Sequence, residues 1–208
     1  MAVMPPQIEA QRADVPPRQA GFGALGALPV ACAVVTAIGA LYILLTAVGN
    51  IVDFPTNEAF VRHVLAMDTT NFGAAPGTEL DEHVMWRAIT SPAAQTAAYL
   101  LIIAWECLSA AVLVYAAILW LGALRSRRFD RPRHMSTIGF LMLLILFMGG
   151  FITIGGEWFQ MWRSDEWNGL QPAFQNTVLA LFGIVLVHLP SPAWAAMTAP
   201  HAEGMPPR

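Results

Sequence analysis

The sequence predicts an all-α membrane protein with four transmembrane helices in a bundle and a short amphipathic helix in the first outer loop. Hydrophobic residues make up 56% of the 208 residues and charged residues only 12%, whereas a soluble domain carries about 25% charged residues. The sequence also contains several long uncharged runs. Their lengths approach the roughly 20 residues that a helix needs to cross a hydrocarbon core of about 30 Å. We place the spans at about residues 29–52, 93–122, 135–160 and 172–189.

The basic residues predict the orientation of these spans. All eleven are arginines, and five lie in the short link between the second and third spans: Arg125, Arg127, Arg128, Arg131 and Arg133. Because short arginine-rich loops stay on the cytoplasmic side, we expect this link and both termini to be cytoplasmic. Residues 53–92 and 162–172 then lie outside, and they are predominantly acidic.

Three regions follow along the chain. Residues 1–20 are rich in proline and polar groups and predict a disordered cytoplasmic tail rather than a signal peptide. Residues 21–190 form the four-span transmembrane domain, and residues 191–208 form a second cytoplasmic tail.

The first outer segment contains its own helix. In NEAFVRHVLAM, Phe60, Val61 and Val64 share one helical face, with polar residues partly opposite. This pattern predicts an amphipathic helix that lies in the membrane interface or caps the bundle. Ser91 followed by Pro92 is a helix start, which fits the beginning of the second span.

Small residues and tryptophans organise the third span. Gly149, Thr153 and Gly156 recur on one face and predict close helix packing. Tryptophans follow where this span should leave the membrane: Trp158, Trp162 and Trp167. We interpret them as interfacial anchors in preference to an aromatic ligand cage.

Glu106, in LIIAWECLSAA, is the most unusual residue of the second span. It lies about 21 Å from Pro92 at 1.5 Å per residue, near the middle of the membrane. An isolated charge at that depth is costly, so we expect a neutral acid unless a cation or metal lies nearby. The side chains of Tyr99 and Ser109 share its helical face. A proton-relay acid, an acid facing a quinone or other polar ligand, and a hydrogen-bond lock between helices remain open.

A second candidate site lies at the outer end of the third span. Glu157 is expected near the depth of Asn50 and Asp53 at the end of the first span. With an arginine of the outer segments as counterion, these residues would form a small polar pocket walled by Trp158 and Trp162. The alternative is a polar network that fixes helix register and binds nothing.

Two histidines raise a cofactor alternative. His134 and His188 should both lie near the cytoplasmic ends of their spans, where they would bracket a haem b. Interfacial solvation is the plainer explanation, and we predict no cofactor. The sequence shows no ligand spacing typical of a metal site, and no phosphate loop, dinucleotide fingerprint or nucleophile elbow.

Four stretches carry a resemblance to a known family. They are NEAFVRHVLAMDTT (57–70), WRAITSP (86–92), AAYLLIIAWECLSA (97–110) and GGEWFQMWRSDEWNG (155–169). In combination they resemble the predicted small integral membrane proteins of bacteria grouped as domain-of-unknown-function family 2165, over about residues 30–190. The resemblance implies a four-span protein of the bacterial inner membrane. It brings no activity, so it assigns no catalytic residue.

Three hypotheses about function follow. The one we favour is a non-enzymatic accessory or scaffold subunit of a membrane complex. The first alternative is a small proton-linked transporter or ligand-binding membrane protein that uses Glu106 and Glu157. The second is a haem- or quinone-binding redox subunit. The expected surroundings are the lipid bilayer and a membrane-protein partner or second copy of the chain, without nucleic acid.

Overall fold

The computed structural model describes residues 25–195. This part of the chain is helical and contains no strand, so the predicted all-α class is confirmed. The elements are α1 (Leu28–Val52), α2 (Phe54–Ala66), the short 3-10 helix η2 (Met85–Arg87), α3 (Pro92–Ser126), α4 (Asp130–Leu144), the π-helix η3 (Ile145–Trp158), the short 3-10 helix η4 (Met161–Arg163), α5 (Leu170–His188) and α6 (Pro192–Ala195). The tail predicted at residues 1–20, and residues 196–208 of the second tail, lie outside the described residues.

Four of these helices are long and apolar enough to cross a membrane: α1, α3, α4 continued by η3, and α5. The largest differences from the predicted spans are at the turn between α3 and α4, where α3 extends to Ser126 and α4 already begins at Asp130. The apolar run ends earlier than the helix, because arginines continue a helix as well as leucines do. With 35 residues, α3 is about 52 Å long and exceeds the thickness of a hydrocarbon core.

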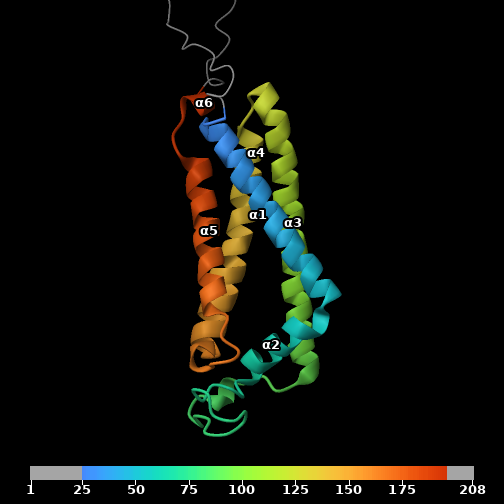
Figure 1. Cartoon of the computed structure of the whole chain (residues 1–208), viewed down its shortest axis with the longest axis vertical. Helices are drawn as coiled ribbons and strands as arrows, with labels where there is room; N and C mark the ends of the chain where they lie inside the picture. Colours follow the sequence, from blue (N-terminus) through green and yellow to red (C-terminus); the bar gives the residue numbers. More distant parts are fainter. Residues whose placement is uncertain (1–24, 196–208) are drawn as a thin grey trace, which may run out of the picture.

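The helices form an elongated bundle in which α1 crosses at an angle. Figure 1 shows α1 starting beside α5 and α6, at the same end as the turn between α3 and α4, and finishing beside α3 at the opposite end. There α2 lies across the bundle, and we call this the α2 end. α1 therefore moves away from α5 along its course and lies beside α3 at the α2 end.

The amphipathic helix is present as predicted, with its apolar side toward the bundle. Val61 of α2 is buried and belongs to a cluster with Tyr99 and Ile103 of α3, while Arg62 on the other side is exposed. A proline at the start of α2, Pro55, suits the first turn of a helix, where backbone N–H groups lack partners. α2 therefore caps the bundle by burying a narrow apolar stripe.

Glycines allow the close approach of helices in the centre of the bundle. The ring of Phe140 on α4 lies between Gly39 of α1 and Gly183 of α5, where added Cβ atoms would come within 3.0 and 2.6 Å of it. At Gly139 a Cβ atom would lie 2.5 Å from Leu113 of α3. Small residues let the helices approach closely at these points. This packing holds membrane bundles together, because lipid is as apolar as the protein core and provides no hydrophobic drive between helices.

A buried polar cluster joins three helices nearer the turn between α3 and α4. The hydroxyls of Thr36 on α1 and Ser136 on α4 lie 3.0 Å apart, and Trp120 Nε1 on α3 donates to Ser136 Oγ at 2.9 Å. All three side chains are buried. Because a buried polar group is costly without a partner, this cluster fixes the helices relative to one another.

The third span changes its winding after Leu144, where α4 continues as a π-helix of 14 residues. Thr153 Oγ1 donates to the carbonyl of Met148, five residues earlier, which fits the wider turn. Of the predicted packing face, Gly156 is buried with Leu170 close by, whereas Gly149 has open space beside it and Thr153 is exposed. The wider winding rotates these residues away from the common face expected for an α-helix.

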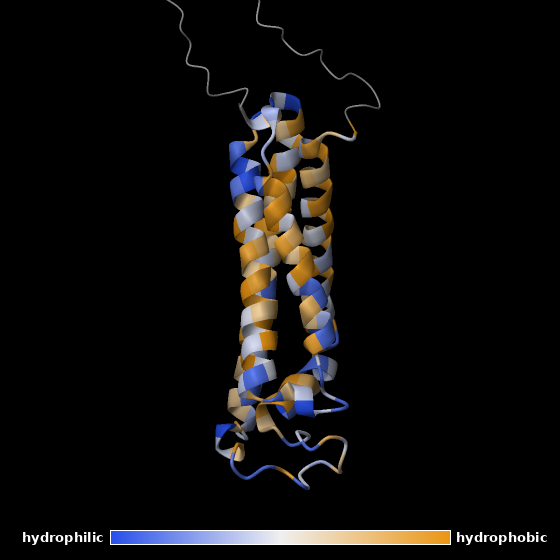
Figure 2. Ribbon diagram, turned by 90° about the vertical axis from the view of Figure 1, so that its left-hand side faces the viewer, coloured by the Kyte–Doolittle hydropathy of each residue, from blue (hydrophilic) through white to orange (hydrophobic). Residues whose placement is uncertain are grey.

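The surface is divided by polarity along the length of the bundle. Figure 2 shows hydrophobic residues dominating the middle of the helices and hydrophilic residues concentrated toward the two ends. Large apolar side chains are exposed on every span, among them Ile38, Leu101, Ile145 and Phe182. An apolar belt with polar ends is the surface expected of helices surrounded by lipid.

Candidate functional site

Glu106 lies inside the bundle and is paired with Asn50. Glu106 is 3% exposed and Asn50 7% exposed. The side-chain amide Nδ2 of Asn50 donates to Oε2 of Glu106 at 2.7 Å, which connects α1 to α3. Within the described part of the chain, no hydrogen bond reaches the second carboxyl oxygen, Oε1.

Two further residues complete the polar network around Asn50. Asn57 of α2 donates through Nδ2 to Asn50 Oδ1 at 2.6 Å, and the hydroxyl of Tyr99 donates to the Asn50 backbone carbonyl at 3.3 Å. Tyr99 is itself buried, with Phe54 of α2 tilted against its ring at 4.7 Å. Asn50 therefore holds α1, α2 and α3 together immediately beside the carboxyl group of Glu106.

A cavity of about 210 Å³ adjoins this network, and we call it the Glu106 cavity. It is lined by five elements: α1, α2, α3, η3 and the start of α5. A space of this size holds several water molecules or a single small organic group. Small-molecule sites commonly have apolar walls and a few polar groups that fix orientation, and this cavity has that composition.

Aromatic rings form part of the walls of the Glu106 cavity. Phe60 comes from α2, and Phe147 and Phe151 come from the π-helix η3. Residues four apart lie on the same face of an α-helix, and they stay close to a common face in the slightly wider π-helix. Phe147 and Phe151 are four residues apart and both line the cavity.

The sequence pointed to part of this site. Tyr99 was expected on the face of Glu106 and does line the cavity. Ser109 instead donates to the carbonyl of Trp105, four residues earlier. Asn57 and the phenylalanines of η3 were missed, because the sequence does not show that α2 folds over the bundle or which face of the third span meets it.

The remaining predicted site residues lie elsewhere. Asp53, at the end of α1, is exposed. Glu157 is also exposed and borders a shallow groove formed by η3 residues alone, including Thr153 and Trp158. The structure therefore brings Asn50 together with Glu106, and it does not bring Glu157 into that site.

The tryptophans expected as anchors divide into two kinds. Trp158 and Trp162 are each 47% exposed, and Trp158 packs edge-on against Trp86 at 5.5 Å with the guanidinium of Arg87 over its ring at 5.1 Å. Trp167 instead turns inward and stacks on the ring of His63 at 4.6 Å with an interplanar angle of 14°. Two of the three thus have the exposure expected of interfacial anchors.

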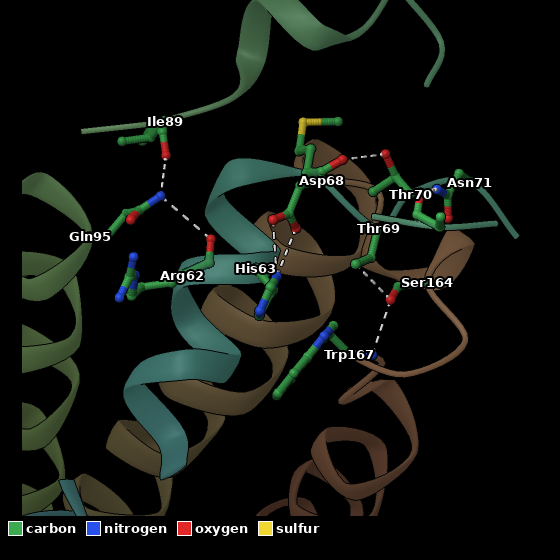
Figure 3. A network of polar contacts seen from close by, with 12 residues as sticks. Arg62, His63, Asp68, Thr69, Thr70, Asn71, Ile89, Gln95, Ser164 and Trp167 are labelled. Atoms are coloured by element: carbon green, nitrogen blue, oxygen red, sulfur yellow. Dashed lines mark hydrogen bonds and ion pairs between the residues drawn. The ribbon is translucent and has the colours of Figure 1, made fainter. Parts of the chain in front are cut away.

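The stacked histidine belongs to a polar network at the α2 end, drawn in Figure 3. His63 Nδ1 lies 2.9 and 3.0 Å from the two carboxyl oxygens of Asp68, just after α2 ends. Thr69 and Ser164 share a hydrogen bond of 2.9 Å, and Ser164 accepts from the backbone of Trp167. The network ties the first outer segment to the segment that follows the third span.

A polar recess of about 320 Å³ lies next to this network. Arg62, His63 and Asp68 border it from one side, and Gln95 from the other. The side-chain amide of Gln95 donates to the carbonyls of Ile89 and Arg62 at 2.7 and 3.5 Å, as Figure 3 shows. Most polar groups around the recess are therefore engaged in holding the cap of the bundle in place.

An ion pair fixes the tip of the same cap. Arg163 Nη1 donates to Asp81 Oδ2 at 3.2 Å, and the guanidinium lies over the ring of Phe72 at 5.1 Å. The backbone N–H of His83, followed by the side chain of Arg163, lowers the pKa of the Asp81 carboxyl. Asp81 is thus charged at neutral pH and links two loops.

The histidines considered for haem lie at the other end of the bundle. His134 on α4 and His188 on α5 are both exposed. His188 Nε2 lies 3.0 Å from the hydroxyl of Thr137, so that ring nitrogen is already engaged. Among residues 25–195, no three His, Cys, Asp or Glu side chains are grouped closely enough to hold a metal ion.

The comparisons with known proteins agree with this architecture. The model of the family described as "Predicted small integral membrane protein (DUF2165)" matches residues 28–190, and the chain belongs to this family. It is therefore an integral membrane protein, with the four spans in a lipid bilayer. Neither the curated proteins nor the solved structures that were compared include a match.

Proposed function

From this family membership and the site just described, we propose that the chain is a non-enzymatic ligand-binding protein of the bacterial inner membrane. The observation that carries the proposal is the pairing of Glu106 with Asn50 beside an aromatic cavity of about 210 Å³. A carboxyl group inside a membrane is costly, and such residues generally serve a function. One oxygen of Glu106 is held by Asn50, and the other remains for a ligand.

The proposal includes an orientation. The turn between α3 and α4 lies at the same end of the bundle as the start of α1 and the end of α5 (Figure 1). Since this turn carries the cluster of arginines, that end is cytoplasmic by the positive-inside rule. The α2 end and the Glu106 cavity then lie in the outer half of the membrane.

The experiment is native mass spectrometry of the protein released from its own membrane in mild detergent. We expect the wild type to carry a small-molecule adduct that is absent from Glu106→Leu. Glu157→Gln is the matched control, because Glu157 is an exposed carboxyl outside the cavity, and it should retain the adduct. A wild type without an adduct, or a Glu106→Leu variant with the same adduct, contradicts the proposal.

An accessory or scaffold subunit is the second candidate, favoured by the surface around η2. Trp86 is 68% exposed and packs on Trp158, with Arg87 over both rings. Tryptophan and arginine are the residues that most often dominate protein interfaces. Of the glycines in the third span, Gly155 and Gly156 do not contribute, since they are buried inside the bundle.

This second candidate is tested by affinity purification with Trp86→Ala. A stoichiometric membrane partner that is present with the wild type and lost with the variant supports it. A protein that purifies alone in both cases removes it. The adduct measurement above is independent of this result, because Trp86 does not line the Glu106 cavity.

A further inference from the structure

We propose that the ligand of the Glu106 cavity is a lipophilic cation, namely a protonated amine with an apolar or aromatic tail. This inference rests on the proposed function, since it names the chemical class of the ligand that the cavity takes. Three features support it: the hydrogen-bonding groups of the cavity that have no partner within the protein, the charges on the cavity walls, and the route by which a ligand enters.

The hydrogen-bond donors of the cavity are largely used within the protein. The hydroxyls of Thr46 and Tyr99 donate to backbone carbonyls at 3.0 and 3.3 Å. The amides of Asn50 and Asn57 each direct one N–H to a neighbouring side chain. Each of these amides keeps a second N–H, but the groups without a partner are more often oxygen lone pairs, including those of Glu106 Oε1 and Asn57 Oδ1. A ligand rich in N–H donors therefore suits the site better than one that only accepts.

The charges on the walls point to the same ligand. Among the described residues that line the cavity, Glu106 is the one acidic side chain, and no arginine or histidine is present. A phosphate or carboxylate would be buried there without a partner, which is strongly unfavourable. A cation would find its counterion in Glu106 and could displace a proton from it.

The aromatic walls favour a positive charge as well. Phe60, Phe147, Phe151 and Tyr99 line the cavity. The face of an aromatic ring attracts a cation, most strongly where water is excluded. An amine bound beside Glu106 would therefore be held by a carboxylate on one side and by rings on the others.

The route into the cavity runs between α1 and α5. Three residues that line the cavity also reach the outer surface of the protein. Pro172 at the start of α5 and Asn57 on α2 are exposed, and Thr46 of α1 is half exposed. Next to Thr46, Leu45 is 60% exposed on the lipid-facing side of α1. A lipophilic ligand would thus enter sideways from the membrane, beneath α2.

The surface above the cavity attracts cations to this end of the protein. The segments 53–92 and 162–172 carry eight acidic side chains against three arginines. Clustered charges of one sign raise the local concentration of oppositely charged ligands. Asp68 and Asp81 are paired with His63 and Arg163, and the remaining excess of acidic side chains fits a cationic ligand.

The test compares three ligands of nearly equal size: 4-phenylbutylamine, 4-phenylbutanol and 4-phenylbutanoate. Their binding to the protein in lipid nanodiscs is measured by calorimetry and corrected with empty nanodiscs. For the wild type we expect the amine to bind at least tenfold more tightly than the alcohol, and the carboxylate to bind most weakly. Equal or tighter binding of the alcohol or the carboxylate overturns the inference.

Variants assign the effect to individual residues. Glu106→Gln should reduce the preference for the amine over the alcohol to less than threefold, whereas Glu157→Gln should leave it unchanged. Thr46→Trp should weaken binding of all three ligands by obstructing the route, and Leu45→Trp, its lipid-facing neighbour, should not. An amine preference that persists in Glu106→Gln overturns the assignment.

Proton release provides a readout that needs no variant. Calorimetry in two buffers of different ionisation enthalpy should show up to one proton released when the amine binds, because the cation replaces the proton of Glu106. Tyr99 is the other titratable residue lining the cavity, while Asp53 and Glu58 lie beyond it, and η3 and α5 contribute none. Binding without any release of protons contradicts this account.

The outcomes also separate this inference from the function on which it rests. If the alcohol or the carboxylate binds as well as the amine and Glu106→Gln alters that binding, the cavity is a ligand site and only the cation assignment fails. If none of the three ligands binds and the protein carries no adduct that depends on Glu106, both proposals fail.

Discussion

The side-chain amide of Asn50 donates a 2.7 Å hydrogen bond to Oε2 of Glu106, joining two helices at residues 56 positions apart in the sequence. Asn50 also accepts from Asn57 of α2 and, through its backbone carbonyl, from Tyr99. Because all of these bonds converge on one residue, Asn50 both fixes the α2 end of the bundle and orients the carboxyl group beside the cavity. The first prediction follows from this.

Replacing Asn50 with leucine should destabilise the protein by about 1–2 kcal/mol. The side chains of Glu106 and Asn57 would stay in place but lose the hydrogen bonds that they make with Asn50. The free energy of unfolding in mixed detergent micelles measures this. Asn176→Leu is the control and should cost much less, since within residues 25–195 the Asn176 side chain bonds only to the Pro172 carbonyl of its own helix. Equal effects of the two substitutions would show that the pair makes no special contribution.

Alanine at Gly139 or Gly183 should each cost about 1–3 kcal/mol, which is typical of overpacked cores. The added methyl would lie 2.5 Å from Leu113 in the first case and 2.6 Å from Phe140 in the second. The same unfolding assay applies. Gly122→Ala is the matched control on α3, where a Cβ atom meets nothing within 4 Å. There we expect no loss or a gain of up to about 1 kcal/mol from helix propensity. Loss of stability in Gly122→Ala equal to that in Gly139→Ala would contradict the packing account.

Acidification should loosen the tip of the cap. The pKa of Asp81 is lowered in the folded protein, so its stabilising contribution is present above the pKa of the unfolded chain and is lost as the pH falls through the folded value. The protection of residues 72–83 against hydrogen exchange, corrected for the pH dependence of the intrinsic exchange rate, should therefore decrease in acid for the wild type. In Asp81→Asn this protection should already be lower at pH 7 and change less with pH. A variant that follows the wild-type profile would exclude Asp81 as the source.

Cysteine labelling in intact bacteria tests the orientation. A membrane-impermeant maleimide should label Ala75→Cys, which is exposed at the α2 end, without lysis. Arg128→Cys, exposed at the turn between α3 and α4, should react only after lysis. The wild type provides the background of Cys32 and Cys107. The reverse pattern would place the Glu106 cavity in the cytoplasmic half of the membrane.

The sequence predicts those features of this protein that arise from residues close together in the chain, and it does not predict contacts between distant segments. The four spans and α2 could be predicted because apolar runs and an apolar stripe are local patterns. For Asn50 and Glu106, the sequence shows only that each is a polar residue inside a separate span, and not that the two are paired. Their contact depends on the angle at which α1 crosses the bundle, which no local pattern encodes.

Other features depended on packing or winding. The glycines that admit Phe140 lie on α1 and α5, and a single sequence does not show which glycine faces which ring. The π-helix displaced Gly149 and Thr153 from the packing face expected of an α-helix. Glu157 was assigned to a polar pocket because of its depth alone, whereas its direction around the helix leaves it exposed.

The central claim, that Glu106 contacts a ligand in this cavity, is tested most directly by cryo-electron microscopy. The protein would be isolated from its own membrane in nanodiscs and enlarged with a bound antibody fragment. The account predicts non-protein density in the cavity, within hydrogen-bond distance of Glu106 and absent from Glu106→Leu. A cavity closed by repacked side chains, or occupied by ordered water alone, would contradict it.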